Sequence, residues 1–144
     1  MTGETDLGVL LEGLKPSLGS RAYVFCSVPG ARYGDLAQLR PLASFQEPEG
    51  LTLVLTQEKA DGEGLVYEGI FRCISLHVHS SLEAVGLTAA VATELAAHAI
   101  SANVIAGFHH DHIFVPSRQA DLAMARLRAL ELRARETRAT LVGD

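Results

Sequence analysis

The sequence predicts an α+β protein made of two ferredoxin-like units of the βαββαβ type, with the N-terminal unit reduced. Two patterns predict this class. In some segments apolar and polar residues alternate, which is the period of a strand, and in others apolar residues recur every third or fourth position, which is the period of a helix. The C-terminal half has the order strand, helix, strand, strand, helix, and the N-terminal half has a shortened form of that order.

The first elements follow from apolar spacing and turn residues. Leucines at 7, 10, 11 and 14 have helical spacing, and Pro16 ends that helix. Asp35 is expected to be the N-cap of a short helix, and 47–50 is a turn between two strands. The expected N-terminal elements are a helix over 6–14, a strand over 21–28, a short helix over 35–39, and a hairpin of strands over 42–46 and 51–57.

Residues 58–64 are polar and lack apolar periodicity, so we expect a boundary between the two halves there. The predicted units are an N-terminal one over 1–66 and a C-terminal one over 67–144. In the second unit, Ile74, Leu76 and Val78 alternate with more polar residues and predict a strand. The further expected elements are a loop over 80–86, a helix from Leu87, strands over 102–108 and 112–116, and a final helix after Ser117.

Composition bounds the class of protein. The 144 residues are 48% hydrophobic and 20% charged, which provides a sizeable core and excludes a disordered chain. The formal net charge of −5 argues against nucleic-acid or anionic-lipid partners. Five C-terminal arginines are interleaved with glutamates at helical spacing and have no aromatic neighbours, so they are expected on a solvated helix face: Arg126, Arg128, Arg133, Arg135 and Arg138.

The two cysteines, Cys26 and Cys73, lie in separate strand-like runs and are expected to be buried thiols in a reducing compartment. The N-terminus is acidic and does not have the pattern of a secretory signal. The weakly polar stretch 84–108 is interrupted by Glu94 and other polar residues, so it predicts protein core and not a membrane span. We expect a cytoplasmic protein without a membrane or nucleic-acid partner.

Catalytic and cofactor motifs are not found. The sequence has neither a Gly-x-Ser-x-Gly elbow nor a glycine-rich phosphate loop, so we expect no enzyme, no catalytic residues and no cofactor. Histidines at 77, 79, 109, 110 and 112 are a weaker indication of a metal site. Because no obvious further ligands accompany them, no metal is predicted, and a histidine-based metalloprotein remains the third hypothesis.

Gly86 precedes the helix that starts at Leu87. A residue without Cβ allows a ligand to approach the backbone, and the free N–H groups of the following helix start can receive a carboxylate. The alternative is that Gly86 only makes a tight strand-to-helix turn. Sequence alone leaves both interpretations open.

The segment from Ile74 to Pro116 resembles the ACT-domain family, which has a strand, a glycine-bearing loop, a helix, a residue like Asn103 and a hairpin in this order. More closely, the runs 76–87 and 106–116 resemble small stand-alone bacterial proteins built of two ACT-like units, and the runs 23–28 and 40–45 fit their N-terminal unit. The resemblance implies regulatory binding of amino acids or similar metabolites at unit or subunit interfaces.

On this basis we expect a non-catalytic sensor of a small amino acid. Its carboxylate would lie at Val85-Gly86-Leu87, and Asp111 or Asn103 would meet the ammonium or the side chain. The candidate ligand-binding residues are Ser80, Ser81, Val85, Gly86, Leu87, Asn103, Val104, His110 and Asp111.

The rival hypothesis is an interaction module that binds no small ligand, in which bulky side chains of 80–87 fill the groove. A homodimer through a sheet surface or edge is also expected. Cys73, Ser75, His77 and His79 give one strand face a mixed character that suits neither full exposure nor a dry core.

Overall fold

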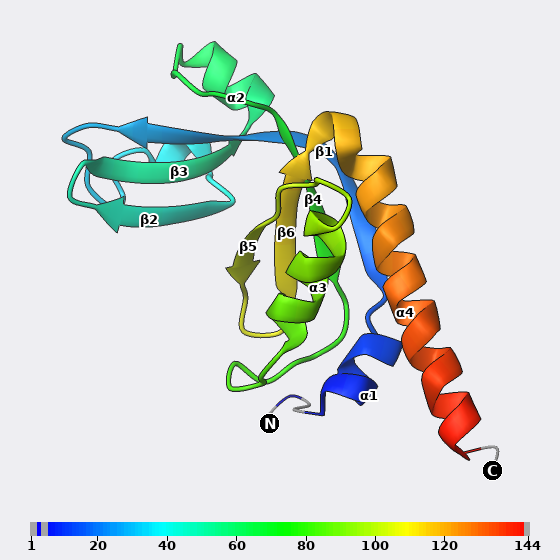
Figure 1. Cartoon of the computed structure of the whole chain (residues 1–144). Coiled ribbons are helices and arrows are strands. Elements are labelled where there is room, and N and C mark those ends of the chain that lie inside the picture. The colour runs from blue at the N-terminus through cyan, green and yellow to red at the C-terminus, as the bar shows by residue number, and fades with distance from the viewer. Residues whose placement is uncertain (1–2, 4–5, 143–144) are drawn as a thin grey trace. The chain divides into compact units, whose positions relative to one another are not determined.

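The computed structural model describes residue 3 and residues 6–142 (Figure 1). Two compact units are formed. One contains the chain up to Gly19 together with the chain from Cys73 onward, and the other contains Ser20–Arg72. The packing therefore does not divide the chain by a single cut, because the first helix packs with the C-terminal half. A boundary between family units near residue 66 stays a prediction.

The described strands form a sheet in the order β2-β3-β1-β4-β6-β5, which confirms the α+β class. The strands are β1 (Pro16–Val28), β2 (Ala43–Glu47), β3 (Gly50–Thr56), β4 (Phe71–Leu76), β5 (Asn103–Ala106) and β6 (Asp111–Pro116). The helices are α1 (Leu7–Glu12), η1 (Ala37–Leu39), α2 (Gln57–Gly62), α3 (Leu87–Ala96), η2 (Ser117–Gln119) and α4 (Ala120–Val142).

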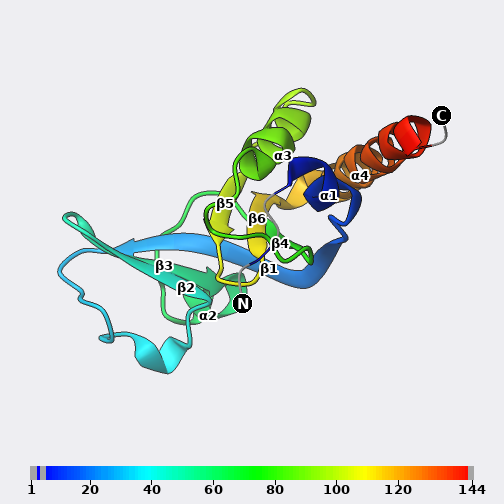
Figure 2. The ribbon, with the colours of Figure 1, turned by 90° about the horizontal axis from the view of Figure 1, so that it is seen from below.

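In the unit that contains both ends of the described chain, α1, α3 and α4 lie on one side of β4 and β6 (Figure 2). Ile74 and Leu76 of β4 and Ile113 of β6 are at most 2% exposed within this core. The predicted stripe of α3 is confirmed, since Leu87, Val91 and Leu95 are its buried residues. The shared core also contains Leu10, Leu14, Ile100, Val115, Ala120, Ala123, Met124 and Leu127.

The unit 20–72 is a three-stranded antiparallel arrangement in which β3 pairs with both β1 and β2. The predicted hairpin is confirmed, and Gly50 is required at its turn. A Cβ at this position would lie 2.5 Å from the carbonyl oxygen of Val28. The connection from β1 to β2 contains only the three-residue η1, so this unit is reduced as predicted. Its core consists of Val24, Cys26, Leu39, Leu51, Leu53, Leu55 and Ala60.

Two predictions for the N-terminal half need correction. The segment 58–64 was expected to be a polar boundary without regular structure, but residues 57–62 form helix α2. Thr56 accepts a hydrogen bond from the backbone N–H of Lys59 at the start of this helix. This helix has six residues and buries only Ala60. So short a helix cannot show a repeat of apolar residues, which is why the sequence did not predict it. Strand β1 begins at Pro16, five residues before the predicted start at Arg21. Its first residues are Pro, Ser, Leu, Gly and Ser, which carry little strand signal.

The short helix also differs from its prediction. It is a 3₁₀ turn over Ala37–Leu39, with Leu36 at the N-cap position. Asp35 does not cap it, because its carboxylate accepts a hydrogen bond from the N–H of Arg32 at 2.8 Å. An Asp side chain can stabilise a turn in the same way as it caps a helix, so the residue type alone cannot distinguish the two.

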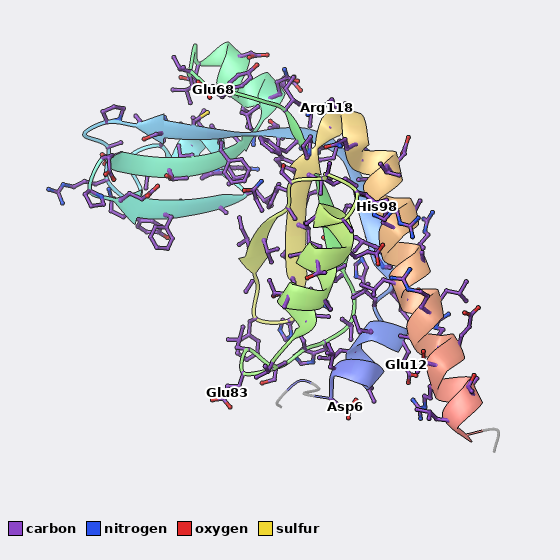
Figure 3. The ribbon with its side chains drawn as sticks, viewed as in Figure 1. Asp6, Glu12, Glu68, Glu83, His98 and Arg118 are labelled. Atoms are coloured by element: carbon purple, nitrogen blue, oxygen red, sulfur yellow. The ribbon has the colours of Figure 1, made fainter. Side chains whose placement is uncertain are left out.

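Four of the five arginines of α4 pair with carboxylates of the same unit, namely Arg126, Arg133, Arg135 and Arg138. Arg126 Nε lies 3.2 Å from Glu94 Oε2 of α3, and Arg133 also binds Glu94. Burial opposes ionisation of Glu94, but the hydrogen bonds from Arg133 and Arg126 outweigh it and lower the pKa of this carboxyl. Arg138 pairs with Glu12 at the end of α1, which Figure 3 labels beside α4. These ion pairs account for the arginine-rich helix face.

None of the helices in the described part of the chain combines the length and apolar character that a membrane span requires.

The Leu10→Ala variant tests whether α1 is a structural part of the unit formed with the C-terminal half. Leu10 is 0% exposed, and its truncation is expected to lower the free energy of unfolding by about 2–5 kcal/mol. Urea unfolding followed by circular dichroism measures the loss. The control is Val9→Ala on the same helix, where the side chain is 40% exposed and a change within about 0.5 kcal/mol is expected. Equal effects of the two substitutions would contradict the packing of α1.

Candidate functional site

A small cavity lies between the segment that follows β4, the first turn of α3, and the β5–β6 hairpin. Its volume is about 80 Å³. The lining residues are Ser80, Ser81, Leu82, Ala84, Leu87, Thr88, Ala106 and Asp111. Four of the residues predicted for ligand binding, Ser80, Ser81, Leu87 and Asp111, are thus brought together around one space.

Two residues of the first turn of α3, Leu87 and Thr88, line this cavity. Ala90 donates the first intrahelical hydrogen bond to the carbonyl of Gly86 at 2.8 Å, so the N–H groups of Leu87 and Thr88 have no partner within the helix. Gly86 is the N-cap residue, and no side chain in the described residues caps this helix through a hydrogen bond to it. Since Leu87 and Thr88 line the cavity, an anion there would meet uncapped amides and the positive end of the helix dipole.

Gly86 also has a structural role. Its φ of +100° and ψ of −17° lie in a region that other residues rarely adopt. A Cβ at this position would lie 3.1 Å from Cδ2 of Leu7, which belongs to α1. The tight-turn interpretation therefore accounts for glycine at this position, because both the turn and the approach of α1 require it.

Asp111 begins β6 and is the cross-strand partner of Ala106. Both residues line the cavity. Burial raises the pKa of the Asp111 carboxyl, and the neighbouring His112 and His110 oppose that increase. The carboxylate is therefore held in a half-buried position where ionisation is costly, which is typical of groups retained for binding or catalysis.

The two serines belong to a loop with its own hydrogen bonds. The hydroxyl of Ser81 accepts a hydrogen bond from the N–H of Glu83 at 3.1 Å, and its carbonyl accepts one from Ala84 at 3.0 Å. The N-terminal Gly3 approaches this loop closely, since a Cβ there would lie 2.5 Å from the carbonyl carbon of Ser80. The loop is thus shaped both by its own turn and by the beginning of the chain.

The other five predicted residues lie outside the cavity lining, and Gly86 is one of them. Val85 is 84% exposed, and Val104 packs against the core of its unit. The side-chain amide of Asn103 donates to the carbonyl of Phe114 at 3.4 Å, so Asn103 supports the β5–β6 pairing. His110 is directed to the β4 side, with Nδ1 3.4 Å from the carbonyl oxygen of Val78.

Sequence reasoning missed Leu82, Ala84, Thr88 and Ala106 as cavity residues. Thr88 could have been found, because it is one of the first-turn positions that follow Gly86. Ala106 lines the cavity only because its register places it opposite Asp111. The sequence indicates a hairpin but not its register, so it could not show that Ala106 lies opposite Asp111.

The histidines cluster without forming a metal centre. The ring centroids of His77 and His110 are 5.5 Å apart, and those of His79 and His109 are 5.2 Å apart. In the described part of the chain, no group of three or more His, Cys, Asp or Glu residues could hold a metal ion. Cys26 and Cys73 are free buried thiols, as predicted, and burial raises the pKa of both.

Two ACT-domain sequence profiles match the chain, over residues 2–72 and 68–129. A Vibrio cholerae protein of unknown function, described as a possible transport protein, is 54% identical, with a TM-score of 0.80 over 87% of this chain and 95% of that one. This chain belongs to the ACT-domain family. The fold class is therefore two ACT units, as the sequence predicted.

More distant structures share the ACT fold. An Agrobacterium tumefaciens protein is 17% identical, with a TM-score of 0.60 over 82% of this chain and 89% of that one. The regulatory subunit of aspartate kinase from Thermus thermophilus is 11% identical, with a TM-score of 0.55 over 82% and 98% of the two chains. No curated protein matches the sequence.

The Gly86→Ala variant tests the structural role of this glycine in the ACT unit. The positive φ and the close approach of Leu7 are expected to cost about 1–2 kcal/mol of unfolding free energy. Urea unfolding measures it against Gly62→Ala, where a Cβ would meet nothing within 4 Å. The Gly62 variant is expected to be neutral or slightly stabilising. If Gly86→Ala is equally neutral, the backbone at this turn does not require glycine.

Proposed function

We propose that this ACT protein is a non-catalytic regulatory sensor that binds a small amino acid in the cavity between the β4–α3 loop and the β5–β6 hairpin. One observation carries the proposal: Leu87 and Thr88, which belong to a helix start without a side-chain cap, and the acidic residue Asp111 line the same space. A free α-amino acid carries the complementary pair of charges on adjacent carbon atoms.

The amino acid's carboxylate would accept hydrogen bonds from the N–H groups of Leu87 and Thr88. These donors point along the helix axis and are fixed by the helix itself, so they need no rearrangement to bind an anion. The hydroxyls of Ser80 and Ser81 belong to residues of the same lining and can add further donors.

The amino acid's ammonium would pair with Asp111. Burial raises the pKa of this carboxyl, so the ionised form is disfavoured when no cation is present. A bound ammonium would offset this cost and add a charge-assisted hydrogen bond. The half-buried acid thus favours ligands with a positive charge over neutral molecules of the same size.

The size of the cavity favours the smallest amino acids. A space of about 80 Å³ compares with a share of about 30 Å³ for one water molecule in the liquid. Glycine and alanine are therefore the first candidates. Ala106 lines the cavity on the hairpin side. Because its own side chain is a single methyl group, the bound amino acid has room there for a side chain of about one methyl group.

The loop conformation favours a sensor over an interaction module without a ligand. A module would fill the groove with the bulky side chains of its own loop. Instead, Val85 is 84% exposed and lies outside the lining, and Leu82 lines the cavity but is itself 65% exposed. The fold shared with the regulatory subunit of aspartate kinase also supports a regulatory role.

The Asp111→Asn variant tests this site. We expect calorimetry to detect glycine or alanine binding to the natural protein and at least a tenfold loss of affinity in Asp111→Asn, because the substitution removes charge and keeps shape. Asp121→Asn in the first turn of α4 is the matched control and should bind normally. Glycolate, which lacks the ammonium, should bind weakly and equally to all three proteins.

Two results would count against the proposal. The first is the absence of any heat or thermal stabilisation with all twenty amino acids at millimolar concentration. The second is unchanged glycine affinity in Asp111→Asn, which would place the ligand elsewhere.

We also propose that the protein forms a homodimer through a sheet surface, and we place it at the exposed Phe45 instead of the strand face of Cys73, Ser75, His77 and His79. In the unit 20–72, the helical residues pack on the side of Leu51 and Leu53. The register of β2 and β3 places Phe45 on the opposite side, where it is 71% exposed. Burial of such a residue against a second copy adds apolar area that a small chain cannot supply by itself.

Sedimentation velocity at pH 8 tests the dimer. The expected species has twice the chain mass of 15.4 kDa, and Phe45→Ser should shift it toward monomer. Tyr33→Ser is the control, since Tyr33 is 82% exposed in the connection that leads to η1. A monomeric natural protein, or a dimer that Phe45→Ser leaves intact, would refute the assignment of this face.

A further inference from the structure

Five of the six histidines gather where the end of β4 meets the β5–β6 hairpin. His77 and His79 come from the segment that follows β4, and His109, His110 and His112 come from the hairpin and β6. Ring centroids are 5.5 Å apart for His77 and His110, 5.2 Å for His79 and His109, and 6.3 Å for His109 and His110. We call these five residues the histidine cluster.

We propose that the histidine cluster is a proton-sensitive switch, which holds the hairpin tip against residues 77–86 when it is neutral and loosens both when it is protonated. Each close ring pair joins one histidine of the β4 side to one of the hairpin side. Neutral imidazoles can pack at these distances. Two imidazolium rings at the same distance repel each other, so protonation acts directly on the contact between the two segments.

Hydrogen bonds fix the neutral arrangement. Nε2 of His77 lies 2.7 Å from the hydroxyl of Ser17, and Nδ1 of His112 lies 2.8 Å from the hydroxyl of Ser75. With neutral rings, these nitrogens can accept the hydroxyl protons. Burial lowers the pKa of His112, and His110 and His77 lower it further, while Asp111 opposes them. The folded arrangement therefore disfavours the charged form of this ring.

The sign of the pH effect follows from that direction. When the folded pKa of a base is lowered, its stabilising contribution is present above its ordinary pKa of about 6.5 and is lost as the pH falls. The raised pKa of Asp111 acts in the opposite direction, because this carboxyl binds its proton more readily in the folded protein. The ring pairs give the expected sign of the switch, because like charges at these distances repel each other.

Among the described residues, the groups that contact the cluster are mostly neutral or cationic. Asp111 is the carboxylate that interacts with it from the hairpin. From the β1 side, Ser17 contributes a neutral hydroxyl, and Lys15 contributes a carbonyl to the N–H of His77 and is itself cationic. On β4, the strand that precedes His77, the polar side chains include Ser75 and the thiol of Cys73. The carboxylate of the 80–86 loop, Glu83, is exposed and points outward at the edge of the unit in Figure 3.

We expect the loosening at the hairpin tip and not in the core, because Val78 and Ala84 hold the loop segment against the core. Ile113 and Val115 of β6 are 0% exposed and remain anchored below the helices. The hairpin turn is closed by a hydrogen bond from Gly107 to the carbonyl of His110 at 2.9 Å, and His110 contacts the carbonyl of Val78. Residues 107–111 and 77–86 can therefore separate as a local opening.

Both segments line the candidate cavity, which gives the switch a consequence for binding. The loop contributes Ser80 and Ser81, and the hairpin contributes Ala106 and Asp111. Regulation of an amino acid ligand by pH rests on the function proposed above. The local opening itself does not, since it concerns the protein without ligand.

Amide hydrogen exchange of the ligand-free protein, read residue by residue by NMR at pH 7.5 and 5.5 and corrected for intrinsic rates, tests the switch. We expect amides of 77–86 and 107–111 to lose at least tenfold protection at pH 5.5 relative to those of Ile113 and Val115. The double variant His77→Gln/His110→Gln should lose part of this pH dependence, because it removes one of the two ring pairs. His98→Gln is the matched control, because His98 follows α3 and pairs with Glu94, outside the cluster (Figure 3).

Equal protection at both pH values in the natural protein would overturn the switch, as would a pH dependence that is undiminished in the double variant. If that variant does not fold, His79→Gln/His109→Gln provides the same test on the second ring pair. Glycine titrations at both pH values separate the two proposals. A pH-dependent opening without any amino acid binding would refute the proposed function and leave the switch standing.

Discussion

The burial of one apolar face of β4 and β6 beneath α1, α3 and α4 is the constraint on which the rest of the site depends. Ile74, Leu76 and Ile113 project into that core. Because side chains alternate along a strand, burial of these residues fixes Ser75 and His112 on the opposite face. The same register starts β6 at Asp111, at the edge of the cavity. The hydrophobic core thus positions polar groups that it does not contain.

The N-terminal helix connects this core to the candidate site. Leu10 and Leu14 are buried with residues of the C-terminal half, and Leu7 lies against Gly86 at the start of α3. The pairing of Arg138 with Glu12 attaches the far part of α4 to the same helix. A segment that precedes the first strand therefore supports the turn that presents the amides of α3. The site is a product of the whole unit and not of one loop.

Several features of this region reduce stability in the absence of a ligand. A helix start without a side-chain cap leaves backbone donors unsatisfied by the protein, and a half-buried carboxyl disfavours its own ionisation. Histidine pairs at 5.2 and 5.5 Å add a cost whenever the rings become charged. Such features are expected where a protein binds a ligand or responds to conditions, because selection for function retains them. Their concentration around one cavity links the proposed binding site to the proposed switch.

Local periodicity in the sequence determined most of the elements. The leucines of α1, the stripe of α3 and the β2–β3 turn are signals that lie within a few residues, and each produced the expected element. The resemblance to ACT domains came from contiguous runs in the same way. It indicated Ser80, Ser81, Leu87 and Asp111, four residues that do line one cavity.

Only the tertiary structure decided which residues meet. The contact of Gly86 with Leu7 and the pairing of Ala106 with Asp111 join positions that have no local pattern in common. Asn103 suits a ligand site by residue type, yet the strand pairing directs its amide to Phe114. The His77–His110 contact likewise requires the hairpin to fold back beside β4. The spacing of apolar residues in the sequence determines which segments become helices or strands. The packing of distant elements determines the strand register and the contacts between side chains, and the chemistry of this site depends on that register and those contacts.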